Sequence, residues 1–395
     1  MDKESEYYTS KMTIFRSAYA RISTRQNLTI HKKRLSLAIC DVPGMSPDSP
    51  LFFLMPPLRL AIVGVRHRHI FALLQEAAKM KEIQLVAICE ENTSTRKAYA
   101  ESKELTITHS SIDAMLASTP CDIIGIGDYY GRRGALAIQS LRAGRHVLAD
   151  KPLCTTLAEC DKIQELSQKA HLKVGCMFGL RWMGPVQLLR KKILDGAIGQ
   201  VRTINITGQH PLMLKKRPGW YFEPGKHGGT INDIGVHAIE AVQWLTGGSV
   251  VEVTGARVWN GKASATPWFK DCAQFMLRLS NDVGVISDVS YLSPDAGGFG
   301  QPQNWRITVH GDDGVLECNS LEPSLTLVNS KNKKPHPLKC PANQESTYLH
   351  DFLAEIKGEP KPFQLTTPYV LRTTRTALQV QQAADQNKSF PFPVK

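Results

Sequence analysis

The stretch GGTINDIGVHAIEAVQWLTGG, residues 228–248, places an aspartate and a histidine four positions apart in an otherwise apolar run. Histidine titrates near neutral pH and a nearby carboxylate tunes it, so Asp233 and His237 have the chemistry of a proton-transfer pair. The alternative is structural: an acid near the start of a helix favours the helix dipole and pairs with a histidine one turn later. This stretch by itself leaves both interpretations open.

The spacing of apolar residues predicts that residues 228–248 form a helix bracketed by glycine pairs. Asp233 and His237 then share a face beside the apolar stripe, together with Glu240 and Trp244. The apolar stripe consists of Ile231, Ile234, Ala238, Ala241 and Leu245.

A lysine precedes a proline at the end of the apolar run HVLADKPL, residues 146–153. At the carboxyl end of a buried parallel strand, Lys151 projects into the ligand crevice and carries a positive charge to the catalytic end of a cofactor. The residue before a proline is restricted and the bond is sometimes cis, which would hold Lys151 in a fixed pose. A lysine in a surface loop is the alternative.

The run LRLAIVGVRHRHIFALL carries part of a dinucleotide-binding fingerprint, because Gly64 ends a strand and a helix follows. Arg66 and His69 stand where two further glycines would be, so the motif is weak, and an ordinary strand-to-helix turn is the alternative. We hypothesise that Arg66 and Arg68 contact phosphate with their side chains instead. Glu90, at the end of the next strand, is placed to bind the ribose 2′-hydroxyl of NAD and to repel the extra phosphate of NADP. A solvated acid at a strand end is the other interpretation of Glu90.

The elements that position these residues follow an α/β pattern. Strands without alternation are expected at 58–64, 83–90, 121–127, 146–150 and 172–178, and helices at 69–80, 94–103, 111–117, 134–144 and 156–170. Buried strands separated by helices predict a doubly wound parallel sheet, a Rossmann domain, with a crevice at the carboxyl ends of its strands. We place this dinucleotide-binding domain at residues 58–180.

Residues 181–395 are expected to form a second, α+β domain for substrate binding and oligomerisation. Runs at 201–209, 250–259, 272–280, 283–292, 305–311 and 314–320 alternate or succeed one another like hairpins, which predicts a mainly antiparallel sheet. The segment 329–344 is expected to be a polar surface loop, and a helix from 367 to 387 to pack back on the body. Residues 1–57 are treated as an extension outside the main fold, partly disordered.

Length, cysteine content and charge limit the classes of function that the protein can have. A chain of 395 residues with 42% hydrophobic and 21% charged residues is long enough for two globular domains. Nine cysteines without close pairs indicate reduced core thiols, and we expect no zinc site. The net charge of +12 is spread along the chain, which suits anionic cofactors and gives no nucleic-acid motif. The first residues are polar and acidic, so we expect no secretory leader, no membrane partner and a cytoplasmic protein.

Five motifs in order resemble the Gfo/Idh/MocA family of NAD(P)-dependent sugar and cyclitol oxidoreductases. They are Gly64 after the first strand, LRAGRHVLADKP, RWMGP with LDGAIGQVR, RPGWYFEPGKHGGT and DIGVHAIEAVQWLTGG. The resemblance rests on individual motifs within residues 58–248. After residue 248 only the general pattern of the sequence resembles the family. Arg133 departs from it, standing about where the family has a histidine after a Thr-Pro-Asn type stretch.

The resemblance implies roles for individual residues. Lys151 matches the family lysine at the reacting hydroxyl, His237 its usual proton acceptor, and Asp233 the aspartate that orients the substrate. Oxidising a secondary alcohol needs a base near neutrality and a cation beside the developing alkoxide, which agrees with these roles. The expected cofactor-binding residues are Gly64, Val65, Arg66, Glu90, Gly127, Asp128, Asp150 and Lys151. The expected substrate-binding residues are Arg181, Trp220, Tyr221, Asp233 and His237. Packing within the core is the alternative for these aromatics and for Trp182.

The leading hypothesis is therefore a dehydrogenase that moves a hydride between a sugar or cyclitol hydroxyl and NAD, with NADP less favoured. A redox-neutral glycosidase of the same fold and a noncatalytic sensor of a dinucleotide or sugar are the alternatives. A pure sensor has no need of a base, which argues against the sensor. The family resemblance also implies a homodimer or homotetramer.

Overall fold

The computed structural model describes residues 56–332, 334–344 and 348–386. The extension expected at residues 1–57 lies almost wholly outside them. Its first sheet has the order β2-β1-β3-β4-β5, with every pairing parallel. The strands are β1 (Leu58–Val63), β2 (Ile83–Cys89), β3 (Ile123–Ile126), β4 (His146–Ala149) and β5 (Val174–Cys176). The last four residues of β1 and all of β3 are buried, as expected for strands covered on both faces. The parallel sheet predicted from the sequence is confirmed.

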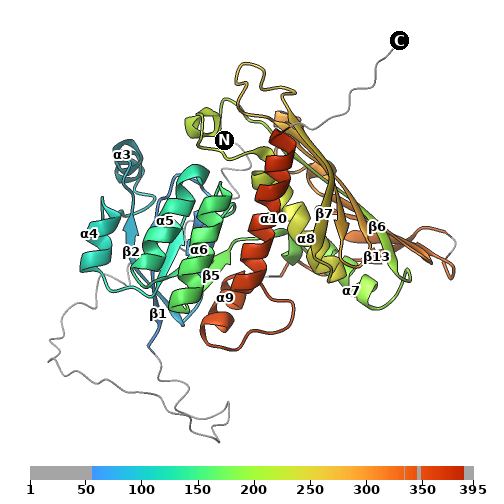
Figure 1. The fold of residues 1–395 in the computed structure, drawn as a ribbon, viewed down its shortest axis with the longest axis horizontal. Helices are drawn as coiled ribbons and strands as arrows, with labels where there is room; N and C mark the ends of the chain where they lie inside the picture. Colours follow the sequence, from blue (N-terminus) through green and yellow to red (C-terminus); the bar gives the residue numbers. More distant parts are fainter. Residues whose placement is uncertain (1–55, 333, 345–347, 387–395) are drawn as a thin grey trace, which may run out of the picture.

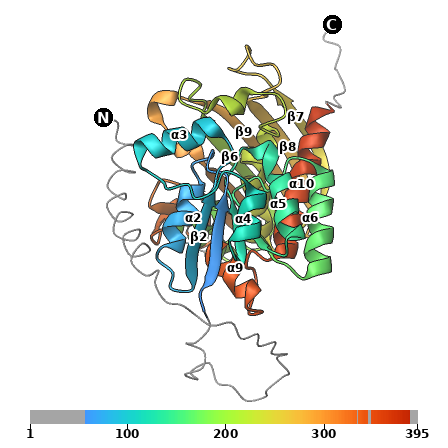
Figure 2. The same ribbon diagram turned by 90° about the vertical axis from the view of Figure 1, so that its left-hand side faces the viewer.

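Five helices connect these strands. They are α2 (Ile70–Ala77), α3 (Thr93–Ser102), α4 (Ile112–Ser118), α5 (Tyr130–Arg142) and α6 (Leu157–Ala170). Side chains of Asn92, Ser111 and Thr156 cap α3, α4 and α6, and Glu159 completes a capping box with Thr156. Right-handed crossovers in this strand order put α2 on one side of the sheet and α4, α5 and α6 on the other, as Figure 2 shows.

The second sheet has the order β13-β12-β11-β10-β6-β9-β8-β7 and is antiparallel except between β6 and β9. Its strands are β6 (Val201–Pro211), β7 (Val250–Trp259), β8 (Cys272–Leu279), β9 (Gly284–Ser293), β10 (Arg306–Gly311), β11 (Gly314–Asn319), β12 (Ser324–Asn329) and β13 (His336–Lys339). From Ala273 onward, β8 alternates buried and exposed residues, because one face of the sheet packs on the core. The mainly antiparallel sheet is confirmed.

The segment 329–344 is not only a surface loop, and that expectation is wrong. Residues His336–Lys339 form β13, which pairs with β12 from Leu327↔His336 to Ser324↔Lys339. The sequence signal was weak because the strand is short, contains a proline and lies at the sheet edge, where proline costs no ladder hydrogen bond.

Four further α-helices lie in the described residues: α7 (Gly184–Leu194), α8 (Val236–Thr246), α9 (Tyr348–Ile356) and α10 (Thr367–Asp385). Helices α8 and α10 lie between the two sheets (Figure 1), and α10 contacts both β5 and β7. Helix α9 also returns to the first sheet, where it contacts α2 and β5. The last part of the chain therefore joins the two sheets into one body, although the domain boundary at residue 180 stays a prediction.

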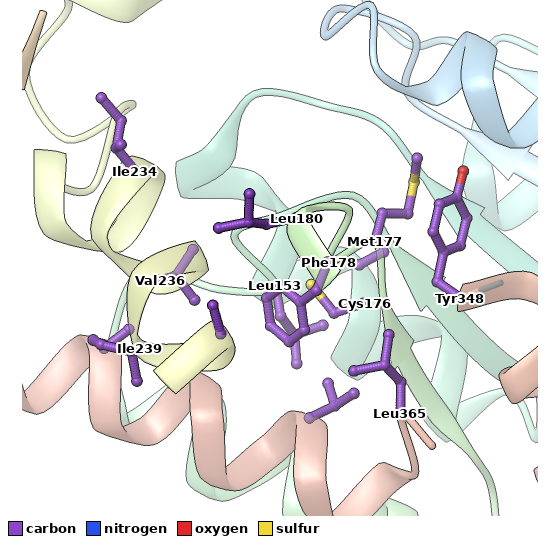
Figure 3. Close-up of a cluster of buried hydrophobic side chains, with 14 of the residues drawn as sticks. Leu153, Cys176, Met177, Phe178, Leu180, Ile234, Val236, Ile239, Tyr348 and Leu365 are labelled. Carbon is purple, nitrogen blue, oxygen red and sulfur yellow. The ribbon is translucent and has the colours of Figure 1, made fainter. Parts of the chain in front are cut away.

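Figure 3 shows a cluster of buried side chains to which both parts of the chain contribute. Phe178 and Leu180 follow β5, while Val236 and Ile239 belong to α8, and the short turn at Leu180–Trp182 contacts α8 directly. This apolar packing fixes the start of α8 against the carboxyl edge of the parallel sheet.

The eight cysteines among the described residues are buried free thiols, in agreement with core positions. No helix in this part of the chain has the length and apolar character needed to cross a membrane.

Candidate active site

The crevice lies where the strand order reverses, between β1 and β3. Gly64, directly after β1, has a left-handed backbone with φ of 73°. A Cβ added there would lie 2.5 Å from Cβ and 2.8 Å from Cα of Asp128, which follows β3. Only glycine lets the two strand ends approach this closely, so the first turn is built as a dinucleotide site requires.

Arg133 anchors the end of β4. Its fully buried guanidinium donates to a carboxylate oxygen of Asp150 at 2.8 Å, to the carbonyl of Asp128 at 2.8 Å and to the carbonyl of Lys151. The Lys151–Pro152 bond that follows is cis. Arg133 thus ties the ends of β3 and β4 together.

Lys151 meets Asp233 across the crevice. Its Nζ lies 2.6 Å from Oδ1 of Asp233 and 3.2 Å from the carbonyl oxygen of the same residue. The two side chains are only 6% and 3% exposed, so the ion pair is buried. The segment 228–248 is helical as predicted, but Ile231–Gly235 is a π-helical turn ahead of α8, a local distortion that often marks functional sites.

The second carboxylate oxygen of Asp233 accepts a hydrogen bond from the Tyr291 hydroxyl. The same hydroxyl lies 2.9 Å from Nε2 of His227, which is itself 3.5 Å from the carboxylate. Burial by itself would raise the pKa of Asp233, but Lys151 and His227 outweigh it and hold that pKa well below its usual range. Asp233 is therefore a carboxylate with a cation on one side and two hydrogen-bonding rings on the other.

His237 is half-buried beside this pair. Its ring lies 5.8 Å from that of Trp305 and 6.4 Å from that of Phe178, and among the described residues its buried Nδ1 has no hydrogen-bond partner. Burial, then the positive charge of Lys151, lowers the pKa of His237 well below its usual value. Asp233 bonds to Lys151 and Tyr291 and lies 3.5 Å from His227. The prediction that Asp233 pairs with His237 within one helix is therefore wrong.

A second buried cluster involves residues that sequence reasoning missed. His67 bonds through Nδ1 to Asp150, and its Nε2 lies 3.1 Å from the Tyr221 hydroxyl and 3.2 Å from that of Tyr130. The two tyrosine hydroxyls lie 2.6 Å apart. Burial lowers the pKa of His67 to about 3, so the ring is neutral. His67 lies in the loop after β1 and Tyr130 at the start of α5, the two segments where the sequence departs from the family pattern. Those departures were the only sequence signal that could have pointed to these two residues.

The ring nitrogens of His67 and His69 and a carboxylate oxygen of Asp150 lie within 4.8 Å of one another, which is a donor set able to hold a metal ion. Asp150, however, already accepts hydrogen bonds from His67 and from the Arg133 guanidinium. A positive charge on the same carboxylate opposes a doubly charged ion there. The arrangement therefore favours the ion pair over a metal.

Several residues fit a dinucleotide in the crevice. Glu90 is only 1% exposed and accepts from the backbone N–H groups of Val65 and Asn92 at 2.9 and 2.7 Å. Burial raises the pKa of Glu90, and these two hydrogen bonds partly offset the rise. A cavity of about 510 Å³ is lined by Val65, Arg66, Ser94, Thr95 and Trp220 among others, but Glu90 does not line it, so its contact with a ribose stays a prediction.

Two further observations bear on the cofactor. Oδ1 of Asp150 is buried with no hydrogen-bond partner in the described part of the chain, which leaves an acceptor for a ribose hydroxyl. Gly127 packs as the fingerprint requires, because a Cβ there would lie 2.5 Å from Cβ of Ile70 in α2. Arg66 pairs with Asp128 at 2.5 and 2.8 Å and Arg68 with Glu104 at 2.8 Å, so their contact with phosphate stays a prediction.

The structure separates the expected substrate residues. Trp220 and Tyr221 stack with ring centroids 4.2 Å apart and pack on Tyr130, so they cover the crevice. Arg181 is not brought to the site: it is fully buried, donates to Glu240 at 2.7 Å and to the Phe363 carbonyl at 2.8 Å. Glu240, on the same helix as His237, thus serves a separate ion pair. His210 on β6 is a further missed residue, whose pKa burial lowers to about 3.

Comparison with known proteins agrees with this geometry. Residues 58–178 match the model of an oxidoreductase family with an NAD-binding Rossmann fold, and residues 186–317 match the GFO/IDH/MocA C-terminal domain. The chain is 25% identical to D-glucoside 3-dehydrogenase of Escherichia coli over 222 residues, 55% of this chain and 61% of that protein. It is 27% identical to inositol 2-dehydrogenase 2 of Saccharopolyspora erythraea over 221 residues, 56% of this chain and 60% of that protein. Each match thus spans less than two thirds of the relative.

An oxidoreductase from Agrobacterium radiobacter, solved in complex with NAD⁺, L-tartaric acid and magnesium, superposes with a TM-score of 0.69 at 16% identity. The alignment covers 84% of this chain and 97% of that one, which shows a shared fold. The two family models together take in more than half of the sequence, in the order that the two sheets follow. The chain belongs to the GFO/IDH/MocA family of oxidoreductases, and its first domain is an NAD-binding Rossmann domain.

Proposed function

We propose that this protein is a dehydrogenase that oxidises a secondary CH–OH group of a sugar, sugar derivative or cyclitol with NAD. The single observation that carries the proposal is the convergence of Lys151 and Asp233, 2.6 Å apart and buried, beside the half-buried His237 at the cofactor crevice. The names of two relatives, a glucoside dehydrogenase and an inositol dehydrogenase, support the substrate class.

The site residues divide the work of alcohol oxidation. Because its pKa is lowered, His237 is a neutral imidazole, and a neutral ring is able to accept the hydroxyl proton. Lys151 donates a hydrogen bond to the same oxygen and stabilises the alkoxide as it forms. Asp233 holds the ammonium group in place through Oδ1. Bound NAD supplies the hydride acceptor.

Burial strengthens these contributions. An ammonium group acts on a developing negative charge far more strongly in a low-dielectric site than in water. The Trp220–Tyr221 stack and Tyr130 form an aromatic wall beside His67. Their aromatic faces also suit the C–H groups of a polyol.

The test follows absorbance at 340 nm with NAD and a panel of inositols, aldoses and aldonic acids, using the wild-type chain and His237→Ala. We expect NADH formation with at least one member and a loss of about 10²–10⁴-fold in the variant, the usual contribution of a general base. Retention of full turnover by His237→Ala would refute the role of His237. No NADH with any member, while NAD stays bound to the purified protein, would favour a redox-neutral enzyme or a sensor instead.

A further inference from the structure

An arginine lies against two of the tyrosines that border the reacting centre. Arg217 is half-buried in the loop that follows β6. The carbon of its guanidinium lies 4.6 Å from the centre of the Tyr221 ring and 4.9 Å from that of the Tyr291 ring. Its Nε and Nη2 donate to two backbone carbonyls where β6 ends, at 2.8 and 2.9 Å. These contacts hold the guanidinium in one position.

Ring contacts connect this arginine to the proposed base. The ring of Tyr291, on which Arg217 stacks, lies 6.4 Å from the ring of His210 on β6. The ring of His210 lies 5.8 Å from that of Trp305, and Trp305 lies at the same distance from His237. The arginine and the base therefore border one site.

The charges around this site leave one cation unpaired. Lys151 and Asp233 pair at 2.6 Å, and Arg133 and Asp150 pair at 2.8 Å, so each pair is neutral. Arg217 forms no ion pair with any described residue. Asp233 is the carboxylate whose charge acts on Arg217, but Lys151 already holds it. One positive charge is therefore in excess.

The histidines of the site do not change this count. Burial, the largest cause in each case, lowers the pKa of His210 to about 3 and that of His237 well below its usual value. Burial lowers the pKa of His227 as well. These three rings are therefore neutral at neutral pH, and the excess charge stays on Arg217.

We propose that Arg217 binds a carboxylate of the substrate, so that the preferred substrate is a sugar acid. The inference rests on the proposed dehydrogenase function and names its substrate class. Two of the five N–H groups of the guanidinium bond to backbone carbonyls. The other three, which include both on Nη1, have no hydrogen-bond partner in the described part of the chain. A planar guanidinium with free N–H groups is the side chain best suited to a carboxylate.

The size of the excess charge favours a carboxylate over a phosphate. A carboxylate carries one negative charge, which balances the single unpaired cation. A phosphate ester carries a charge of about −1.5 to −2 at neutral pH and would need a second cation. A neutral sugar would leave the half-buried guanidinium with three unused donors. The site therefore matches a polyol that bears one carboxylate.

The test compares hexuronates with the neutral aldoses of the same configuration, in the glucose, galactose and mannose series, with NAD. We expect the wild type to favour one uronate over its aldose by about 10–100-fold in kcat/KM, mostly through KM, as for one charge-assisted interaction. Arg217→Met should remove this preference. Arg217→Lys should keep part of it, because lysine retains the charge but not the planar fork. Lys215→Met, which removes an exposed cation from the same loop, is the matched control and should keep the preference.

An arginine that only fixed the loop would affect the acid and the neutral sugar alike. An unchanged preference in Arg217→Met would therefore overturn the inference and leave the dehydrogenase function intact. The same conclusion follows if the wild type oxidises the neutral aldoses as well as every uronate. Higher kcat/KM with glucose 6-phosphate than with glucuronate would overturn the choice of a carboxylate.

If the wild type oxidises no sugar, the proposed function fails, and calorimetric titration of the uronates in the presence of NADH tests the inference without turnover. We expect one uronate to bind to the wild type and to Lys215→Met, and at least about tenfold more weakly to Arg217→Met. Should Arg217→Met not fold, Arg217→Lys gives the same comparison. No binding of any uronate to the wild type, or equal binding to a folded Arg217 variant, would overturn the inference.

Discussion

The buried pair of Lys151 and Asp233 makes a quantitative prediction about stability. Asp233→Asn removes the negative charge and leaves the ammonium with neutral partners: the amide oxygen, the backbone carbonyl at 3.2 Å and the Tyr130 ring at 5.8 Å. Lys151→Met leaves the carboxylate with Tyr291 and His227. Removing one partner of a buried ion pair costs about 3–5 kcal/mol, because the other charge stays desolvated. We expect Asp233→Asn near the upper end and Lys151→Met near the lower end.

The double variant Lys151→Met/Asp233→Asn buries no unpaired charge, so it should cost no more than the larger single change. The two single changes then exceed the double change by at least about 3 kcal/mol, which is the coupling energy of the cycle. The measurement is urea unfolding at neutral pH with NAD absent from every sample, since a bound ligand would shift the result. Lys162→Met is the matched control, because its ion pair with Glu165 is exposed and should contribute little to stability.

If the two single changes in the free energy of unfolding add up to that of the double variant, the reasoning is refuted. Additivity would mean that the two charges do not interact. Turnover gives a second readout from the same proteins. Lys151→Met should lose most of its activity while still binding NAD, and unchanged turnover would remove Lys151 from the reaction.

Three further predictions follow from named contacts. The pKa of His67 is lowered to about 3 in the folded protein, against about 6.5 in the unfolded chain. Its contribution to stability is therefore complete above about pH 6.5 and is lost as the pH falls toward about 3. His67→Gln should make the unfolding free energy depend less on acid, by about 1.4 kcal/mol per pH unit in this range, and an unchanged slope would contradict this. Arg181→Met should destabilise the protein by about 3–5 kcal/mol through the unpaired Glu240, with KM unchanged in the folded enzyme; a raised KM at full stability would return Arg181 to substrate binding. Gly64→Ala should abolish NAD binding measured by fluorescence titration, since a Cβ meets backbone atoms at 2.8 Å, whereas Gly144→Ala, with φ of 75° and nothing within 4 Å, should bind normally.

Local patterns in the sequence determined much of the architecture. The unbroken apolar runs at 58–64 and 121–127 predicted buried parallel strands, because such strands are covered on both faces. The carboxyl ends of these strands share one edge, so Gly64, Asp128 and Lys151 were predictable as neighbours of a single crevice. The helical period likewise placed Asp233 and His237 near the start of one helix.

Tertiary structure decided which partner each of these side chains meets. Asp233 bonds to Lys151, 82 residues earlier, and to Tyr291, 58 residues later, and neither contact leaves a trace in local periodicity. Arg181 looked like a pocket residue but its charge is balanced by Glu240, brought beside it by packing. Periodicity reports which face of an element is buried, because burial repeats with the backbone. The chemical partner across that face depends on how distant elements pack, and a single sequence does not encode that pairing locally.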